Sequence, residues 1–494
     1  MDEMELSMLL EMAAEGCPDR VAVGRRADGL TYAQLLARAR SLGARLAGQD
    51  LQHVGMVDTN SEAVPLLVYA ASYAGLPFVP LNYRLADAQL QAAVRRIAPA
   101  VVVASPEQAA RFPGIEGITV VSPDDLARVD AHDAEEPPSG GDIAILLFTS
   151  GTSGEPKGAV LRPSHLVSYV LSTVEFLGAE EDEAILVSVP PYHIAGISTV
   201  LTSVYNGRRM VQLPAFSPEG WVELARAERI THAMVVPTML GRILDVVEAD
   251  GEGLPALRHL SYGGGRMPGT VVERALRLLP DVDLVNAYGL TETSSTISVL
   301  GPEDHREAAA STDPDVRRRL GSVGRPLPSV EIEIRDHDGT VVGPGEQGEI
   351  FVRGEQVSGE YLSHKAIDDE GWFPTRDRGL LDAAGFLYVD GRADDVIVRG
   401  AENLSPGEIE DVLVQHEAVA EVAVVGLPDT EWGERVVAAV VLHAGKDASE
   451  KELQDWVRAR LRSSKTPSEV HFVEVLPHNE TGKLLRRVLR EQLA

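Results

Sequence analysis

Residues 146–158, Leu-Leu-Phe-Thr-Ser-Gly-Thr-Ser-Gly-Glu-Pro-Lys-Gly, combine the residue types that bind phosphate groups. An apolar run, typical of a buried strand, leads into a loop of glycines and hydroxyls that Lys157 closes. Glycines let backbone N–H groups turn toward an anion, hydroxyls donate further hydrogen bonds, and the lysine adds positive charge. A Walker A loop has Gly before its lysine and Ser or Thr after it, whereas Pro156 and Gly158 hold those places here. The segment therefore predicts phosphate chemistry outside the P-loop class.

The elements that must position this loop alternate between short apolar strands and amphipathic helices. Leu35, Ala39, Leu42 and Leu46 recur at helical spacing, and the apolar stretch 64–80 predicts a buried helix that ends at Gly75. Strands are predicted over 101–104, 143–148, 184–189 and 231–236, and helices over 221–229 and 237–248. This alternation predicts the α/β fold class, with a large N-terminal domain of layered, largely parallel sheets.

From residue 330 the pattern changes to short alternating strands with Gly-rich turns. Strands over 330–335, 349–352 and 386–389 predict a small β subdomain at about 320–391. Residues 391–395, Gly-Arg-Ala-Asp-Asp, open a last unit, which is predicted as strand, helix (406–415), strand (419–426), strand (435–442), helix (449–462) and strand (469–475). The predicted domains are therefore 1–391 and 392–494, the second a small α+β domain.

Composition and charge exclude several classes of protein. A chain of 494 residues suits two or three domains, and its net charge of −30 argues against nucleic acid or an anionic membrane as a partner. A single cysteine, Cys17, excludes a disulfide framework and a cysteine-based metal site. The acidic start, Met-Asp-Glu-Met-Glu, lacks the basic segment of a signal peptide, and prolines and glycines interrupt the stretch 64–80. We therefore expect a cytoplasmic protein with no membrane span.

Seven further motifs follow the phosphate loop. They are Pro190-Pro-Tyr-His-Ile-Ala-Gly196, Tyr262-Gly-Gly-Gly-Arg-Met-Pro268, Asn286-Ala-Tyr-Gly-Leu-Thr-Glu292, Gly371-Trp-Phe-Pro-Thr-Arg-Asp377, Gly391-Arg-Ala-Asp-Asp-Val-Ile397, Glu402-Asn-Leu-Ser-Pro406 and Pro477-His-Asn-Glu-Thr-Gly-Lys483. In order and spacing, over essentially the whole chain, they resemble the ANL superfamily of acyl-CoA synthetases, nonribosomal peptide adenylation domains and luciferases. The resemblance implies a mobile C-terminal domain and the cofactors ATP, Mg²⁺ and coenzyme A. It implies a reaction in which a carboxylate and ATP give an acyl-adenylate and pyrophosphate, and a thiol then takes the acyl group.

Lys483 resembles the catalytic lysine of this family. A carboxylate that attacks an α-phosphate brings two anions together, a repulsion of about 4 kcal/mol at ~4 Å with an effective dielectric of ~20. Positive charge must therefore reach the reacting centre, and a turn over 479–482 suits the delivery of an ammonium group. Only six of the 45 basic residues are lysines, and two of them, Lys157 and Lys483, stand in anion-handling motifs.

The remaining nucleotide-binding roles follow from the resemblance. Glu292 resembles the Mg²⁺ carboxylate, with Thr152 as a second oxygen, because Mg²⁺ on ATP takes one or two protein oxygens. Tyr288 offers an aromatic face to adenine, with a core tyrosine as the alternative. Asp377 would accept the ribose hydroxyls, and Arg392 would donate to the same sugar. In full, the implied ATP- and AMP-binding residues are Thr149, Ser150, Gly151, Thr152, Ser153, Gly154, Lys157, Gly264, Gly265, Arg266, Asn286, Ala287, Tyr288, Gly289, Thr291, Glu292, Asp377, Arg392 and Lys483.

Asp394 resembles the hinge of the family. Large φ/ψ changes there would swing the last domain so that Lys483 leaves the site, and Gly400 and Ala401 enter it to line the path of a pantetheine arm. Trp432 occupies a place where some relatives stack the adenine of CoA, and a buried core tryptophan is an equally weighted alternative.

The motif that contains His193 resembles the acyl pocket of acyl-CoA synthetases. Amino-acid-activating relatives have an aspartate in this region, whereas residues 192–198, Tyr-His-Ile-Ala-Gly-Ile-Ser, have none, and a buried unpaired ammonium is costly. The substrate is therefore predicted to be a carboxylic acid other than an amino acid. The implied pocket residues are His193, Ile194, Ala195, Gly263, Ala287, Gly289, Ser294 and Ser295. Because most of these are small, we expect room for a bulky, cyclic or aromatic acid.

Two positions depart from the family pattern. Arg376 stands between Thr375 and Asp377 where glycine is usual, and a positive φ there would strain it by roughly one or two kcal/mol. Residues 463–468, Ser-Ser-Lys-Thr-Pro-Ser, have fewer basic groups than relatives that touch CoA at this place, which weakens the case for CoA as acceptor.

Three alternatives remain beside the acyl-CoA-forming ligase. In the first, the acyl group would go to the phosphopantetheine of a carrier protein, which would act in trans because no fused carrier domain is recognised. A catalytically silent nucleotide-binding protein is the second alternative, motivated by Arg376, and an oxygenating luciferase is a remote third. Helix faces for self-association look like helix faces for the core, so no oligomeric state is predicted.

Overall fold

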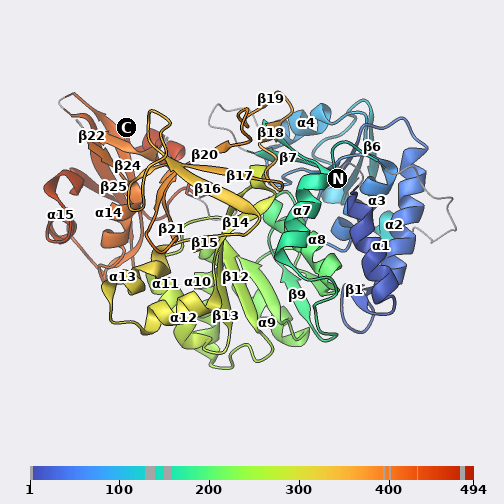
Figure 1. Cartoon of the computed structure of the whole chain (residues 1–494), viewed down its shortest axis with the longest axis horizontal. Coiled ribbons are helices and arrows are strands. Elements are labelled where there is room, and N and C mark those ends of the chain that lie inside the picture. Colours follow the sequence, from blue (N-terminus) through green and yellow to red (C-terminus); the bar gives the residue numbers. More distant parts are fainter. Residues whose placement is uncertain are drawn as a thin grey trace.

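Two large sheets and the helices between them form the first two thirds of the chain (Figure 1). The computed structural model describes residues 4–127, 140–149, 157–392, 395–399, 402–430, 432–478 and 484–494. In spatial order, sheet A consists of β15 (Arg325–Pro326), β14 (Ser295–Leu300), β13 (Asp283–Leu290), β12 (His259–Gly263), β11 (His232–Val235), β9 (Ala184–Val187), β10 (Arg209–Gln212), β1 (Val21–Val23) and β2 (Leu30–Thr31). Sheet B consists of β19 (His364–Lys365), β18 (Glu360–Tyr361), β8 (Lys157–Leu161), β7 (Ile145–Thr149), β4 (Phe78–Pro80), β3 (His53–Val57), β5 (Ala100–Ala104) and β6 (Ile118–Val121).

The centres of both sheets are parallel, and antiparallel strands lie at their edges. Parallel neighbours need crossover connections, and helices supply them on both faces of each sheet. Between the sheets, sharing one core with both, lie α1 (Leu6–Gly16), α2 (Tyr32–Ala47), α3 (Ala63–Ala74), α7 (Pro163–Thr173) and α8 (Ile194–Asn206). On the other face of sheet A lie α9 (Pro218–Ala227), α10 (Pro237–Asp250), α11 (Gly269–Leu278) and α12 (Pro302–Ala310), while α4 (Asp87–Arg96) covers the other face of sheet B. The short helices α5 (Pro106–Ala109), α6 (Pro123–Ala127) and α13 (Pro314–Arg317) lie in connections.

Local sequence signals place the ends of these helices. Thr31 begins α2, because its side chain accepts a hydrogen bond from the backbone N–H of Gln34. Gly75 ends the buried helix α3 at φ +68°, a left-handed conformation that glycine adopts without strain. The predicted end of this helix is therefore confirmed. Within the described residues, no helix is long and apolar enough to cross a membrane.

Two smaller sheets follow in the chain. Sheet C is antiparallel and contains β16 (Val330–Arg335), β17 (Gly348–Gly354), β20 (Phe373–Leu381) and β21 (Leu387–Arg392). Sheet D contains β23 (Glu402–Leu404), β22 (Ile397–Arg399), β25 (Gly433–Leu442), β24 (Val419–Asp429) and β26 (Glu469–Phe472), with α14 (Pro406–Leu413) and α15 (Glu450–Arg458) on one face and α16 (Arg486–Leu493) on the other. Figure 1 shows sheet D at the opposite end of the molecule from α1 and α2.

The observed elements agree with most predicted ones, and the main differences are as follows. Helix α16 was not predicted, because its sequence is mainly charged and Leu489 alone of its residues is fully buried. The predicted helix 449–462 ends at Arg458, and the predicted strand 469–475 ends at Phe472. Within the stretch 320–391, β15 joins sheet A, and β18 and β19 join sheet B instead of sheet C. This last difference places β18, from the β-rich stretch, beside β8 in the hairpin of β7 and β8, which we call the phosphate-loop hairpin because the predicted phosphate loop connects its strands.

Candidate active site

A hydrogen-bonded group forms where sheet A and sheet B meet. After β13 the chain turns through η1 (Thr291–Thr293), a short 3₁₀ helix, and buries Glu292 to 9% exposure. The Glu292 Oε1 accepts a hydrogen bond of 2.6 Å from the Tyr361 hydroxyl, and the Lys157 Nζ lies 5.7 Å from the centroid of the Tyr361 ring. Burial and then the negative charge of Glu292 raise the pKa of Tyr361, so this hydroxyl stays protonated and donates. An acidic motif and a phosphate-loop lysine thus share one aromatic neighbour.

Tyr361 was not among the predicted site residues. It stands in Gly359-Glu-Tyr-Leu362, which has no run of glycines and hydroxyls to mark it. The Glu292 carboxylate has a second oxygen, Oε2, which receives no hydrogen bond from the residues that the structure describes. One available carboxylate oxygen fits Mg²⁺ on ATP, which takes few protein ligands.

A second group joins β13 to sheet C. The Asp377 Oδ2 accepts a hydrogen bond of 2.6 Å from the Tyr288 hydroxyl, and Asp377 Oδ1 lies 3.1 Å from the Arg392 Nε. Arg392 also donates to the carbonyl oxygen of Thr375 at 2.8 Å. Burial and the Asp377 charge raise the pKa of Tyr288 well above its usual value. The three residues predicted to bind adenine and ribose therefore lie together, and their mutual bonds orient the Asp377 carboxylate.

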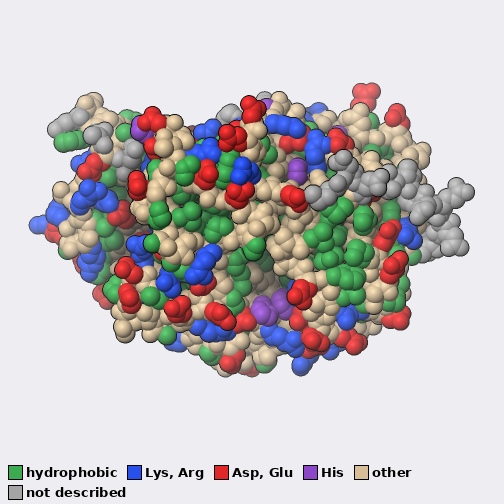
Figure 2. All heavy atoms as spheres, in the orientation of Figure 1, with side chains coloured by type: hydrophobic (Ala, Val, Ile, Leu, Met, Phe, Trp, Pro, Cys, Tyr) green, Lys and Arg blue, Asp and Glu red, His purple; other side chains and the backbone are tan. Residues whose placement is uncertain are grey.

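These two groups lie within electrostatic reach of one another, since the charge of Arg392 partly offsets the rise in the pKa of Tyr361. Acidic and basic side chains are interspersed over the face that Figure 2 shows. Because the chain has a net charge of −30, its long-range field repels an anionic nucleotide. Binding of a nucleotide therefore depends on local donors such as Lys157 and Arg392.

Arg376, in strand β20, has a φ of +62°. The position therefore requires the left-handed backbone conformation for which glycine is suited. The Arg376 side chain is 67% exposed and its Nε lies 3.9 Å from the Glu349 Oε1, so the guanidinium points outward. The departure from the family pattern thus strains the backbone without filling the site.

We expect Arg376→Gly to stabilise the protein by about 0.5–1 kcal/mol. Relief of left-handed strain outweighs the greater freedom of glycine in the unfolded chain. Urea unfolding followed by circular dichroism measures the change. Arg378→Gly, in the same strand at a φ outside the left-handed region, is the control and should destabilise by about 0.5–1 kcal/mol. Equal destabilisation by both substitutions would contradict the strain.

The glycines of the predicted site fall into two kinds. A Cβ on Gly263 would lie 2.2 Å from the Ala287 carbonyl oxygen, and one on Gly289 would lie 1.8 Å from the Ser295 carbonyl oxygen. Close backbone approach between strands requires glycine at these two places. Gly264 and Gly265 differ, because a Cβ there would meet no atom closer than 3.7 Å. Neighbouring atoms therefore do not require glycine at these two places.

The predicted acyl-pocket residues come from the start of α8, from β12 and β13, and from the turn between η1 and β14. His193 is half-buried and precedes α8, where it directly adjoins Ile194 and Ala195. The hydroxyls of Ser295 and Ser198 are hydrogen-bonded at 3.1 Å, which ties the turn to α8. Ser294 is fully buried, and its hydroxyl has no hydrogen-bond partner in the described part of the chain.

Arg266 and Asn286, both predicted to bind nucleotide, have structural contacts here. Arg266 is hydrogen-bonded to Asp411 of α14, and a Cβ on Gly407 would clash with its guanidinium. The Asn286 amide donates to the Ser322 carbonyl oxygen at 3.1 Å. In this arrangement Arg266 therefore binds the C-terminal domain, which its sequence motif did not indicate.

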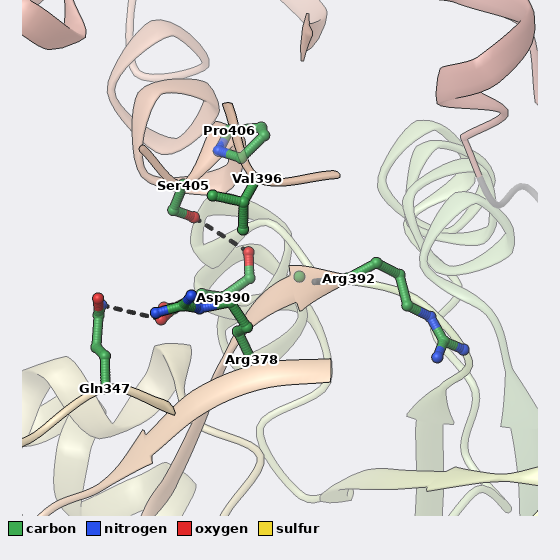
Figure 3. Close-up of a pocket in the computed structure, with 8 residues that line it drawn as sticks. Gln347, Arg378, Asp390, Arg392, Val396, Ser405 and Pro406 are labelled. Carbon is green, nitrogen blue, oxygen red and sulfur yellow. Dashed lines mark hydrogen bonds between the residues drawn. The ribbon is translucent and has the colours of Figure 1, made fainter. Parts of the chain in front are cut away.

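A small pocket beside this contact lies between sheet C and the C-terminal domain (Figure 3). The Asp390 carboxylate accepts from the Gln347 amide at 3.0 Å, and its backbone carbonyl accepts from the Ser405 hydroxyl at 3.2 Å. In Figure 3 the side chain of Arg392 points away from this pocket. The bond from Ser405 joins the two predicted domains next to the predicted hinge, whereas the bond from Gln347 lies within the first of them.

Trp432 is 48% exposed, which excludes the alternative of a buried core tryptophan. The Arg399 guanidinium lies 5.7 Å from its ring centroid. Thr149 ends β7 and pairs with Lys157 of β8, Ala287 lies in β13 and Thr291 begins η1. Other predicted residues lie outside the described residues: Ser150, Gly151, Thr152, Ser153, Gly154, Asp394, Gly400, Ala401 and Lys483.

Comparison with known proteins identifies the family. The sequence matches the AMP-binding enzymes over residues 10–362 and their C-terminal domain over residues 408–483. The chain is 34% identical over 496 residues to the 2-succinylbenzoate–CoA ligase of Bacillus licheniformis, covering 97% of this chain and 98% of that protein. It is 30% identical over 515 residues to the indoleacetate–CoA ligase of Aromatoleum aromaticum, covering 99% and 98%.

A comparison with solved structures supports the same family. The o-succinylbenzoate CoA synthetase of Bacillus subtilis, in complex with ATP and a magnesium ion, matches with a TM-score of 0.84 and 30% identity, over 98% of this chain and 99% of that one. The protein therefore belongs to the family of AMP-binding enzymes. This confirms the predicted ANL superfamily and the predicted fold class.

Proposed function

We propose that the protein is an AMP-forming acid–thiol ligase. It activates a carboxylic acid with Mg-ATP to an acyl-adenylate and pyrophosphate, and then transfers the acyl group to coenzyme A with release of AMP. The observation that supports this most is the hydrogen bond that joins Tyr288, of the motif that ends in Glu292, to Asp377 of a separate motif, in a chain of the AMP-binding family. Two similar proteins are CoA ligases.

Each residue has a chemical task in this proposal. Asp377, oriented by Tyr288 and Arg392, binds the ribose hydroxyls. Lys157 binds phosphate, and Lys483 brings an ammonium to the reacting centre. Mg²⁺, when bound by Glu292, neutralises phosphate charge and so lowers the repulsion that the attacking carboxylate meets.

The acid is proposed to be aromatic, with a neutral substituent that forms hydrogen bonds. The buried hydroxyl of Ser294 has no hydrogen-bond partner among the described residues, which costs about 1–3 kcal/mol, so a substrate group that bonds to it would be favoured. Residues 192–198 contain no carboxylate to pair with an amino group. The similar ligases act on 2-succinylbenzoate and indoleacetate, which are both aromatic acids.

Coenzyme A is the proposed acceptor, and a carrier protein in trans is the alternative. Trp432 is exposed beside Arg399, where it presents an aromatic face and a cation to a nucleotide. Lys465, the basic residue of the segment 463–468, is hydrogen-bonded to Glu408, so it contributes less to binding a phosphate. The cytoplasmic location and the hinge at Asp394 stay predictions.

The test measures pyrophosphate release with Mg-ATP across aliphatic, aromatic and substituted aromatic acids, with and without coenzyme A, and identifies the products by mass. We expect an acyl-CoA product with aromatic acids. In Lys483→Ala the rate of pyrophosphate release should fall by about 100-fold or more, because the ammonium that offsets the repulsion between the reacting anions is lost. Lys451→Ala, on the exposed surface of α15, is the control. Adenylate without thioester would favour a carrier protein. Nucleotide binding without pyrophosphate release from any acid would favour the catalytically silent nucleotide-binding protein.

A further inference from the structure

The segment 356–362 connects the predicted metal carboxylate to the phosphate-loop hairpin. On one side it holds η1, because the backbone N–H groups of Ser358 and Gly359 donate to the Glu292 carbonyl oxygen at 2.8 and 3.0 Å. The Gln356 amide donates to the Thr293 and Thr296 carbonyl oxygens at 3.1 and 2.8 Å. The backbone around Glu292 is thus fixed by this segment.

On its other side the same segment is bound to β8. Glu360 and Tyr361 pair with Val160 and Ala159, and the Leu362 N–H donates to the Gly158 carbonyl oxygen at 2.9 Å. The Arg162 guanidinium donates to both oxygens of Glu360, at 2.9 and 3.0 Å. Because β8 begins at Lys157, the position of Tyr361 relative to this lysine is fixed as well.

Within this frame, the Tyr361 hydroxyl occupies one oxygen of the Glu292 carboxylate and leaves the other available. A carboxylate with one oxygen occupied binds a cation most readily through the other oxygen alone. Mg²⁺ accepts few protein oxygens in near-octahedral geometry, whereas Ca²⁺ takes six to eight oxygens and often both oxygens of a carboxylate.

We propose that Tyr361 is a positioning residue that restricts Glu292 to one metal-binding oxygen and thereby favours Mg²⁺ over Ca²⁺ at the nucleotide site. The proposal rests on the proposed function, in which Glu292 binds the metal of Mg-ATP. The ring of Tyr361 also stacks on His364, with centroids 5.0 Å apart, and the Lys157 Nζ lies 5.7 Å from the ring centroid, so these two ring contacts help to hold the hydroxyl at Glu292.

The test is calorimetric titration of the whole protein with ATP, without acid or thiol, in MgCl₂ and separately in CaCl₂. We expect the wild type to bind ATP more tightly with Mg²⁺, and Tyr361→Phe to reduce the ratio of the two affinities by about tenfold, because the lost hydrogen bond was made to a charged group. Phenylalanine keeps the ring contacts. The ratio is the readout, since a merely structural role would weaken ATP binding equally with both cations.

Tyr388→Phe is the matched control, because the Tyr388 hydroxyl lies 3.5 Å from Asp382 in the turn between β20 and β21. Its ratio should equal that of the wild type, and circular dichroism checks that each variant is folded. An unchanged ratio in folded Tyr361→Phe would overturn the role of Tyr361 while the proposed function stands. No ATP binding by the wild type with either cation would overturn both.

Discussion

Replacing Glu292 by glutamine is expected to lower the rate of adenylate formation by about 100-fold to 1,000-fold. Glutamine has nearly the same shape, and its amide oxygen still accepts a hydrogen bond from Tyr361, so the fold around η1 is retained. What is lost is the negative charge at the oxygen that faces the proposed metal, and removal of one electrostatic contact of this kind costs rates of that order. Acid-dependent exchange of labelled pyrophosphate into ATP measures the effect.

Glu303→Gln is the matched control for this substitution, because Glu303 is exposed in the first turn of α12. It should retain the wild-type rate. An activity of Glu292→Gln within threefold of the wild type would remove Glu292 from the metal site. The hydrogen bond with Tyr361 would then be a structural contact only.

Replacing Asp377 by asparagine is expected to weaken ATP binding by about 10-fold to 100-fold, as the loss of charge-assisted hydrogen bonds at a buried site predicts. The Asp377 carboxylate accepts from Tyr288 and pairs with Arg392, so a neutral amide at this place both disorders these neighbours and binds the ribose less well. Calorimetric titration with ATP and with 2′-deoxy-ATP separates the two causes. A ribose contact predicts that the wild type prefers ATP and that the variant loses much of this preference.

Asp382→Asn is the control, because the Asp382 carboxylate accepts backbone N–H bonds from Ala384 and Phe386 in the turn before β21. This substitution should lower the stability without changing the preference for ATP over 2′-deoxy-ATP. If Asp377→Asn behaved in the same way, Asp377 would support the fold and would not bind the sugar.

Most of the fold could be predicted from the sequence because its signals are local. The alternation of apolar residues along strands such as 101–104, and the glycine that ends α3, depend on neighbours within a few residues. The pairing of Asp377 with Arg392 also followed from motifs, since both lie at the end of the sheet C hairpin formed by β20 and β21.

The parts that could not be predicted depend on contacts between distant residues. Tyr361 meets Glu292 only because β18 leaves the β-rich stretch and pairs with β8. Arg266 binds Asp411 because two domains meet there, and no spacing within its own motif reports that contact. The sequence alone does not distinguish a glycine that a ligand requires from one that a neighbouring strand requires, and the structure shows a neighbouring strand at Gly263 and Gly289.

The pairing of β18 with β8 also has a consequence during synthesis on the ribosome. Strand β8 is complete at Leu161, but the strand that covers its edge follows about 200 residues later. At the usual translation rates of about 5–20 residues per second, the edge of sheet B stays uncovered for ~10–40 s on each nascent chain. Its residues Gly-Ala-Val-Leu are apolar, and an uncovered edge of this kind pairs readily with other chains. We therefore expect nascent chains to be most prone to association through this edge until residue 361 has been made.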